Sequence, residues 1–478
     1  MYLSESKYLR MLTLCGLYVA QGVPWGFVTV TFAAWLAKDE NNLTTEQLGP
    51  ILAVATLPWS FKFVWGPIMD AISIPKFGRR RPWIILAQSL AILVLSSLLL
   101  SKDLPGMVWT SPDDATGLWK HVYHLVPGPL AAMILLANVF VSMQDVAVDA
   151  LAVDLLTEQE RGVANGLMYG SSYLGTALGG AGLGTVVGLY GIQAGLLGQA
   201  IILGLIMLLP LLIRERPAEQ SQLSGGETSA AEPGQPAGEL VSVVSDAVES
   251  DPDYPPQQVN LAAAKPYRVV WELLRAFSLR STMLGTIVAL SCRACLAVIT
   301  TVLLDFLLKR GGWTQQEYTD VNGGYAVFAG LFGAVLGGFL ADRIGTKKMI
   351  FLLTVGIGCL WTVFALSPPM LYDKSRMMVF LVIQELLFSM YLVTLFSMFM
   401  SISWPRVAAT QFTAYMAFMN LSTTAGSYIA GWTGGVIGRE AHNGIPLVLG
   451  GAAVVQVMIM LPVFLIDPGE TRRVLGDE

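Results

Sequence analysis

Long apolar runs separated by short polar turns follow one another along almost the whole chain. An α-helix needs about 20 mostly apolar residues to span a bilayer. The runs are continuous rather than alternating between apolar and polar residues, which excludes the strands of a membrane β-barrel. The pattern therefore predicts an all-α polytopic membrane protein with 12 transmembrane helices. The twelve windows lie at 11–37, 48–74, 83–101, 128–156, 162–189, 192–213, 277–308, 321–343, 349–368, 376–402, 406–437 and 444–465.

The composition restricts the function classes further. Only 13% of the 478 residues are charged and 54% are hydrophobic, with a mean hydropathy of +0.60. A soluble domain carries about 25% charged residues, so a soluble enzyme and a disordered protein are both excluded. The net charge is −5 and no basic stripe is present, which excludes nucleic acid as a partner. Since the chain has no phosphate-binding loop and no metal-ligand cluster, we expect no cofactor, no metal and no catalytic residue.

An acidic, polar segment divides the chain in two. Residues 215–264 contain nine acids and one base and are rich in Ser, Gly and Pro, a composition that cannot bury a core. We expect a disordered cytoplasmic linker over 215–265, with one six-helix half at 1–214 and a second at 266–478. Residues 266–276 have the pattern of a short amphipathic helix on the inner membrane surface, with a loop as the alternative.

The basic residues indicate an orientation. If both termini lie in the cytoplasm, 19 of the 29 Lys and Arg residues fall in cytoplasmic segments, 8 fall in outer loops and two fall inside spans. This asymmetry follows the positive-inside rule and predicts an even number of spans.

Two motifs recur in the two halves. Gly66 and Asp70 reappear as Gly338 and Asp342, each time before a turn with bases. The sequence at Arg161 is echoed at 406–410, where the fifth helix of each half begins. Two parallel six-helix halves are the layout of the major facilitator fold. Acids and bases at these places predict a latch that closes the inner side, with mere positive-inside charge as the alternative. The latch set is Asp70, Arg79, Arg80, Arg81, Asp154, Arg161, Asp342, Arg343 and Lys347.

The fourth helix carries polar residues whose burial in the membrane is energetically unfavourable. Gln144, Asp145 and Asp149 all lie within the window 128–156, and each buried carboxylate costs about 2.5–3.5 kcal/mol at mid-membrane. With a rise of about 1.5 Å per residue, Lys62 on the second helix reaches the same depth and is able to pair with either carboxylate. Asp145 and Asp149 are therefore candidates for proton coupling. The alternative is a permanent ion pair that fixes the second helix against the fourth.

The seventh helix carries Arg293 near its middle. Gly66 and Gly338 are 272 residues apart, and the same offset places Gln21 at the equivalent position on the first helix. The planar guanidinium binds carboxylate or phosphate through two hydrogen bonds, so Arg293 is a candidate contact for an anionic substrate. The alternative is a structural pair with Glu385 or Asp305. The candidate substrate-binding set is Gln21, Lys62, Gln144, Asp145, Arg293 and Glu385.

Residues 61–70, residues 77–83, the Gln144–Asp149 pattern and Glu160-Arg161-Gly162 together resemble the AmpG-type muropeptide permeases. They are also similar to the related acetyl-coenzyme A transporters, and the likeness covers roughly residues 15–180. The resemblance implies import of cell-wall sugar–peptide fragments with protons, by rocking of the two halves. Lys62, Asp70, Asp145 and Asp149 would then be the family's polar core residues.

The same resemblance implies a monomer in a bacterial inner membrane, with a small-molecule substrate and protons as partners besides the lipid bilayer. The alternative within this class is a facilitator for another solute, such as acetyl-CoA, a sugar or a siderophore. A membrane-embedded enzyme would need catalytic groups near one interface, and a non-transporting scaffold would not need carboxylates inside the membrane.

Overall fold

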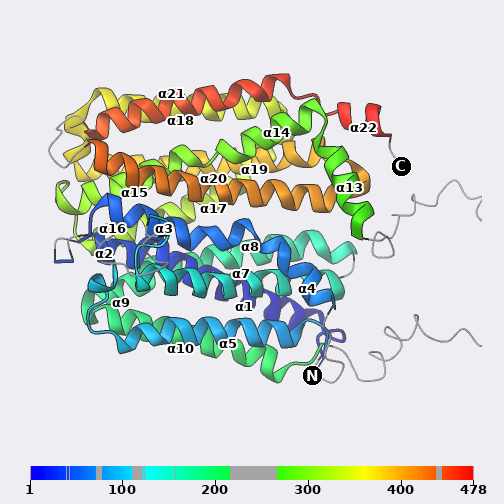
Figure 1. The fold of residues 1–478 in the computed structure, drawn as a ribbon, viewed down its shortest axis with the longest axis horizontal. Coiled ribbons are helices and arrows are strands. Elements are labelled where there is room, and N and C mark those ends of the chain that lie inside the picture. Colours follow the sequence, from blue (N-terminus) through cyan, green and yellow to red (C-terminus); the bar gives the residue numbers. More distant parts are fainter. Residues whose placement is uncertain are drawn as a thin grey trace, which may run out of the picture.

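A computed structural model describes residues 2–38, 40–41, 43–71, 78–109, 122, 124–156, 158–215, 266–437 and 444–476. These residues form a bundle of long, nearly parallel helices without β-strands (Figure 1). Both chain termini lie at one end of the bundle, which we call the termini end; the other is the far end. The predicted linker lies outside the described residues, except for Glu215.

The N-terminal half consists of six helical runs, two of which are interrupted by a π-helical stretch and one by a 3-10 turn. The first run joins α1 to α2, the second joins α3 to α4, and the fifth joins α8 to α9. The bounds are α1 (Lys7–Gly26), α2 (Ala33–Ala37), α3 (Thr45–Ser60), α4 (Trp65–Ala71), α5 (Arg81–Ser97), α7 (Pro129–Leu155), α8 (Glu158–Ala177), α9 (Leu183–Tyr190) and α10 (Ile192–Leu212).

The C-terminal half repeats this arrangement after one extra helix at its start, and a short helix follows its last run. Here the first run is α14 and α15 and the second is α16 and α17. The bounds are α13 (Pro266–Phe277), α14 (Arg280–Ser291), α15 (Ala294–Lys309), α16 (Gln315–Asp320), α17 (Ala326–Ile344), α18 (Thr346–Leu366), α19 (Lys374–Ile402), α20 (Ala408–Ile437), α21 (Gly444–Leu465) and α22 (Glu470–Leu475).

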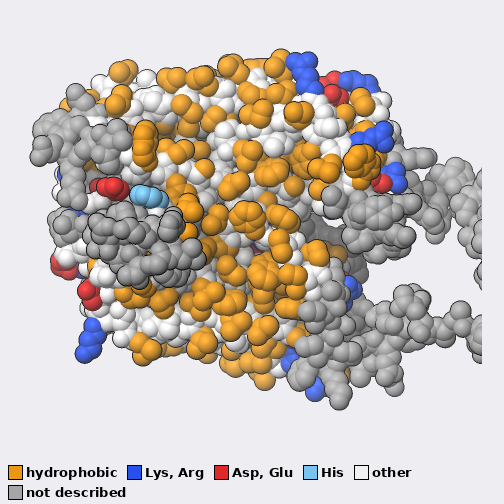
Figure 2. Space-filling model, in the orientation of Figure 1, with side chains coloured by type: hydrophobic (Ala, Val, Ile, Leu, Met, Phe, Trp, Pro, Cys, Tyr) orange, Lys and Arg blue, Asp and Glu red, His pale blue; other side chains and the backbone are white. Residues whose placement is uncertain are grey.

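Every one of the predicted windows contains a helix. Among the described residues, 10 helical runs are long and apolar enough to cross a membrane. The windows at 162–189 and 406–437 hold α8 with α9, and α20, which do not meet that criterion, so the count of 12 spans stays a prediction. The helix predicted at 266–276 is confirmed as α13, and the loop alternative is wrong. Apolar side chains cover the visible face of the bundle, while charged ones gather at its two ends (Figure 2).

Glycines allow α1 and the fifth run to cross at very short range. A Cβ atom on Gly22 would lie 2.2 Å from the carbonyl oxygen of Ser172, and one on Gly179 would lie 2.1 Å from that of Val23. Only a residue without a side chain fits such a crossing. The crossing positions α1, which carries part of the polar cluster described below.

The two halves are joined from the far end to mid-membrane. On the termini side of Lys62, no hydrogen bond or ion pair between two described residues joins them. Glycine also brings the backbones together on the far side, since a Cβ on Gly180 would lie 2.7 Å from Gly323. The bundle is therefore closed at the far end. The joining pairs are Thr45–Asp305, Lys309–Leu43, Gln316–Thr185, Thr56–Thr424, Asn420–Trp59 and Tyr428–Leu125.

Candidate functional site

The second helical run breaks where its charged residue lies. Helix α3 ends at Ser60, a 3-10 turn covers Lys62–Val64 and α4 begins at Trp65. Pro58 lies in the last turn of α3, but a proline disturbs the helical turn that precedes it, so it does not by itself account for the break after Ser60. The break leaves Lys62 inside the bundle at about the depth of the carboxylates on α7.

Lys62 forms an ion pair with Asp145. The ammonium nitrogen lies 2.8 Å from Oδ2 of Asp145, and the two side chains are 18% and 9% exposed. The predicted pairing between the second and fourth helices is thus confirmed, and the structure selects Asp145 as the direct partner. A desolvated pair of this kind is held by its mutual attraction, because each charge alone would be costly there.

Asp149 lies one helical turn further and has a different partner. The hydroxyl of Tyr18 on α1 donates a hydrogen bond to Oδ1 of Asp149 at 2.5 Å. The ring of Tyr169 on α8 packs edge-on against Tyr18, with ring centroids 6.1 Å apart. Lys62 interacts electrostatically with Asp149 and Tyr169 as well as with Asp145. We call the set Tyr18, Lys62, Asp145, Asp149 and Tyr169 the N-half network.

The charges of the N-half network do not balance when both carboxylates are ionised. One ammonium offsets one carboxylate, and the other is left with a hydroxyl donor. A single bound proton makes the set neutral. The two tyrosines were not predicted, although Tyr18 is a polar residue in an apolar run only three residues before Gln21.

The two glutamine candidates lie apart from this network. The amide of Gln144 donates to Gln88 on α5 at 3.1 Å, and Gln88 in turn donates to the carbonyl oxygen of Leu203 at 2.7 Å. Gln144 therefore joins α7 to α5 instead of facing Lys62. Gln21 is 4% exposed, and its amide nitrogen has no hydrogen-bond partner among the described residues.

The C-terminal half places its own charge at a helix break. Arg293 lies between α14 and α15, and its backbone N–H donates to the hydroxyl of Ser422 at 3.1 Å. Its Nε is buried and has no hydrogen-bond partner among the described residues. Glu385 on α19 and Tyr173 on α8 lie within its electrostatic range. We call Arg293 and Glu385, together with Tyr173 that reaches them from the N-terminal half, the C-half cluster.

Arg293 is not locked in a salt bridge. No carboxylate of a described residue lies within 4.0 Å of its guanidinium, and Glu385 instead accepts a bond from Ser389 at 3.4 Å. The alternative pair with Asp305 is wrong, because Asp305 binds Lys309 at 2.6 Å and Thr45 at 2.8 Å near the far end. The guanidinium thus keeps donor capacity for another anion.

The predicted latch residues are spread over the termini end. Arg80 pairs with Asp154 at 3.0 Å, which joins α5 to α7. Asp342 and Arg343 are exposed, with the Arg343 guanidinium 4.2 Å from the centre of the Phe339 ring. Lys347 donates to the carbonyl oxygen of residue 466. The side chains of Asp70 and Arg161 lie outside the described part of the chain.

The start of α5 is held by a residue that the sequence analysis assigned to the linker. The carboxylate of Glu215 accepts backbone N–H bonds from Arg79 and Arg80, both at 2.9 Å, and a further one from Arg81. A carboxylate at a helix N-terminus satisfies free donors and complements the helix dipole. Sequence alone gave no signal for this contact, because the two segments are more than 130 residues apart.

Comparisons with known proteins match the same part of the chain. A family model described as acetyl-coenzyme A transporter 1 matches residues 10–173. A putative transporter AmpG 4 of Rickettsia felis is 28% identical over 179 residues, which are 37% of this chain and 38% of that protein. The anhydromuropeptide permease of Escherichia coli is 26% identical over 181 residues, 37% of this chain and 31% of that protein. Each match thus covers less than two-fifths of the relative's length, and the resemblance seen in the sequence is confirmed.

Solved structures match nearly the whole chain at low identity. The nucleoside transporter NupG gives a TM-score of 0.64 at 11% identity, covering 95% of this chain and 98% of that one. A D-xylose–proton symporter gives 0.61 at 14%, covering 95% and 97%. A bacterial homologue of the human lysosomal transporter Spinster, inward-facing and unoccupied, gives 0.63 at 15%, covering 99% of both chains. These likenesses establish the fold.

Proposed function

We propose that this membrane protein, which has the major facilitator fold, is a secondary transporter that imports anionic cell-wall muropeptides together with protons. The observation that carries the proposal is the N-half network. It places two carboxylates and one ammonium inside the bundle, at a break in a membrane helix and beside the part of the interface where no hydrogen bond or ion pair between described residues joins the halves. Charged residues are retained inside a membrane protein chiefly where they serve a pathway for ions or substrate.

The geometry supports a division of labour between the two carboxylates. Asp145 is bound to Lys62 at 2.8 Å, so its charge is already compensated. Asp149 is bound to a neutral hydroxyl, that of Tyr18. Uptake of one proton by Asp149 leaves a neutral network, and its release restores a negative charge that attracts Lys62. We therefore assign proton coupling chiefly to Asp149, with Asp145 as the second member.

The C-half cluster supports an anionic substrate. Arg293 lies at mid-membrane with a buried, unpartnered Nε, and a carboxylate of a muropeptide would supply the missing acceptors. Gln21, Lys62, Gln144, Asp145 and Glu385 remain proposed as further substrate contacts. Among these, Gln144 is the one whose amide is already engaged elsewhere.

The latch remains a proposal as well. Of the proposed latch members at the termini end, Asp342 and Arg343 are exposed, while Arg80 is buried and paired with Asp154 within the N-terminal half. We expect this end to face the cytoplasm of a bacterial inner membrane, with both termini there. The exposed pair would then move against the other half when the far end opens.

A second candidate is export or import of acetyl-coenzyme A, because the matching family model carries that description. Coenzyme A is also an anion, so Arg293 suits it too. The two candidates differ in shape: one is a sugar with a peptide, the other a nucleotide with a long pantetheine arm that ends in a small acetyl group. The positive charge of Arg293 suits both substrates, so only transport assays can distinguish the two candidate functions.

The test is uptake by proteoliposomes under an imposed inward proton gradient, with labelled anhydro-muropeptide and labelled acetyl-coenzyme A in parallel. We expect the muropeptide to accumulate only with the gradient. Uptake of acetyl-coenzyme A alone would replace the first substrate by the second, and uptake of neither would refute both.

Two variants assign the roles. Asp149→Asn keeps an acceptor for Tyr18 but cannot bind the proton, so we expect facilitated exchange without uphill accumulation. Undiminished uphill uptake would contradict the coupling role, and Asp103→Asn, an exposed site outside the spans, is the control. Arg293→Gln should raise the KM for anionic substrate about 10-fold or more, the cost of one charged hydrogen bond of about 1.5–3 kcal/mol.

A further inference from the structure

The helix α13 carries an outward surface that the transport proposal does not use. Trp271 and Leu274 are 69% and 60% exposed, and Arg275 beside them is exposed as well. Positions three and four residues apart lie on one face of a helix, so these three side chains form a single stripe. We call Trp271, Leu274 and Arg275 the outer face of α13.

The opposite face of α13 is packed against the bundle. Ala276 is fully buried and forms a small apolar cluster with Trp404 and Val407, both 2% exposed, just before α20. The indole N–H of Trp404 donates to the carbonyl oxygen of Gly476 at 3.0 Å, which ties the chain's C-terminal segment to the same place. The outer face is thus held in a fixed orientation.

The outer face of α13 carries no acid, because the acid of this helix forms an ion pair on the side that faces the bundle. Glu272 is the only acid in α13, and it turns towards the bundle, where its Oε1 lies 3.1 Å from Arg406. Its side chain is 17% exposed. The acid is therefore neutralised from within, and the outer face presents apolar side chains together with the positive charge of Arg275.

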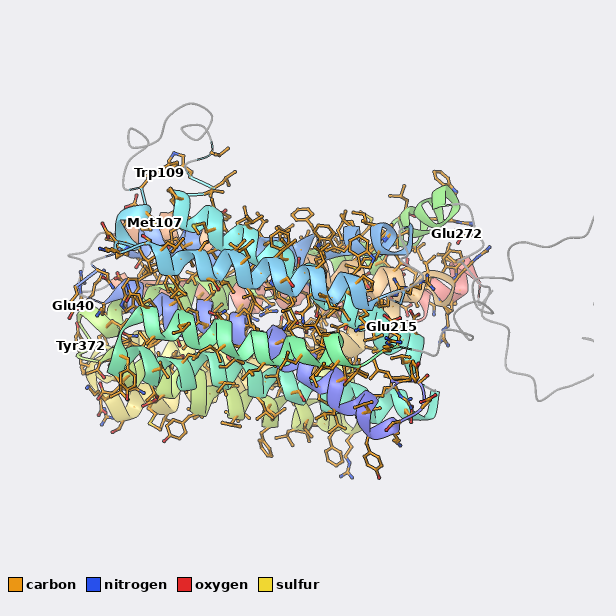
Figure 3. The ribbon with its side chains drawn as sticks, turned by 90° about the horizontal axis from the view of Figure 1, so that it is seen from below. Glu40, Met107, Trp109, Glu215, Glu272 and Tyr372 are labelled. Carbon is orange, nitrogen blue, oxygen red and sulfur yellow. The ribbon has the colours of Figure 1, made fainter. Side chains whose placement is uncertain are left out.

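The position of α13 indicates what covers this face. The helix ends at Phe277, and the membrane span that begins at Arg280 follows after a turn of two residues. In Figure 1 α13 runs across the termini end at a steep angle to the spans, and Figure 3 shows Glu272 at that end, opposite Glu40 and Tyr372. A helix at this level, lying across the spans, is at the depth of the lipid headgroups.

We propose that the outer face of α13 binds the anionic phospholipid surface at the termini end. Trp271 and Leu274 enter the boundary between headgroups and acyl chains, and Arg275 contacts lipid phosphate, aided by the exposed Arg280. Tryptophan and leucine beside a base are the side chains that an interfacial helix uses. Because Arg406 precedes α20, the Glu272–Arg406 pair transmits the anchoring to a helix that joins the two halves at the far end.

The test places the full chain in nanodiscs of phosphatidylcholine containing a small fraction of brominated phosphatidylglycerol, or the reverse. Bromine quenches tryptophan fluorescence at short range, so the difference between the parent protein and Trp271→Phe reports the lipid beside Trp271. We expect stronger quenching by the brominated anionic lipid. Trp432→Phe is the matched control, since Trp432 on α20 is also 69% exposed and should show no preference.

We expect Arg275 to account for the preference for anionic lipid. Arg275→Gln should reduce the preference for the anionic lipid about fivefold, the effect of one base at a charged surface, and raised salt should do the same. Equal quenching of Trp271 by both lipids would overturn the anionic-lipid assignment. Absence of quenching by either would overturn the membrane contact altogether and point to a protein partner or water on this face.

Discussion

Removing the ammonium of the N-half network while leaving its partner should destabilise the protein strongly. In Lys62→Met the aliphatic stem is kept and the charge is lost, so Asp145, 9% exposed, remains as an uncompensated buried carboxylate. Breaking a buried pair in this way costs about 3–5 kcal/mol. The free-energy cost is limited, because Asp145 in the variant can bind a proton and become neutral. Neutralising an ordinary aspartate at pH 7 costs about 4 kcal/mol, since its pKa of about 3.9 lies roughly three units lower.

The expected loss at pH 7 is therefore about 3–4 kcal/mol, a factor of roughly 10²–10³ in the ratio of folded to unfolded protein. If the variant binds a proton that the unfolded chain does not bind, its stability rises by about 1.4 kcal/mol for each pH unit of acidification between pH 7 and pH 4. In the parent protein Lys62 compensates Asp145, so the network contributes only the slope of the proposed proton site Asp149, which both proteins share, and the variant adds the slope of Asp145. A steeper pH dependence of stability in the variant than in the parent would show that Asp145 has been left without a compensating charge.

The assay is thermal unfolding of purified protein in one detergent at pH 7 and pH 5. The double variant Lys62→Met/Asp145→Asn removes both charges and should recover most of the loss, while Lys102→Met, at an exposed position outside the spans, should change little. A double variant no more stable than Lys62→Met would refute the reasoning, because the stranded charge would then not be the cause. So would a loss that does not depend on pH.

Two further predictions concern packing and the chain's C-terminal segment. Gly179→Ala should cost more than the roughly 1–3 kcal/mol of ordinary over-packing, because its Cβ would meet the backbone carbonyl of Val23 at 2.1 Å; Gly166→Ala on α8, with nothing within 4 Å, is the control in the same thermal assay. The side-chain hydroxyl of Ser281 donates to Glu470, and so does its backbone N–H at 2.7 Å; this bonding lowers the pKa of Glu470 below its ordinary 4.5. A carboxylate with a lowered pKa stabilises the segment above pH 4.5, and this stabilisation is lost as the pH falls through the lowered pKa. Hydrogen exchange of α22 should therefore rise only in strong acid. A rise near neutral pH would contradict the prediction.

Depth in the membrane was predictable, because a helix rises by a constant distance per residue. On this ground Lys62 was expected to pair with Asp145 or Asp149, and it pairs with Asp145. Gln144 was proposed as a substrate contact because it is polar and lies next to Asp145 in the fourth helix, yet its amide faces Gln88. Residue count states how deep a side chain lies but leaves open which neighbouring helix it faces, since that depends on how each helix is rotated in the bundle.

The breaks in the helices illustrate a second limit. Hydropathy treats 48–74 and 277–308 as single apolar runs, while the structure interrupts them next to Lys62 and Arg293. The interruption frees backbone groups and turns the two bases inward, where irregular backbone is tolerated inside protein. Neither break has a clear signal in the sequence: Pro58 acts on the turn before it, which is helical, and no proline lies near Arg293.

The apolar pattern was enough to predict the fold class, because membrane-spanning helices need only length and apolarity and because the Gly–Asp motif of one half recurs in the other. It also determined which charges are costly enough inside the membrane to require a purpose. The folded structure was needed to show that Asp145 and not Asp149 holds Lys62, that Tyr18 donates to Asp149 and that Glu215 caps α5. It was also needed to show that no carboxylate of a described residue binds Arg293 and that the halves meet at the far end. These outcomes depend on contacts between residues far apart in the chain, and local pattern carries no information about which of several partners at the same depth comes within hydrogen-bond distance.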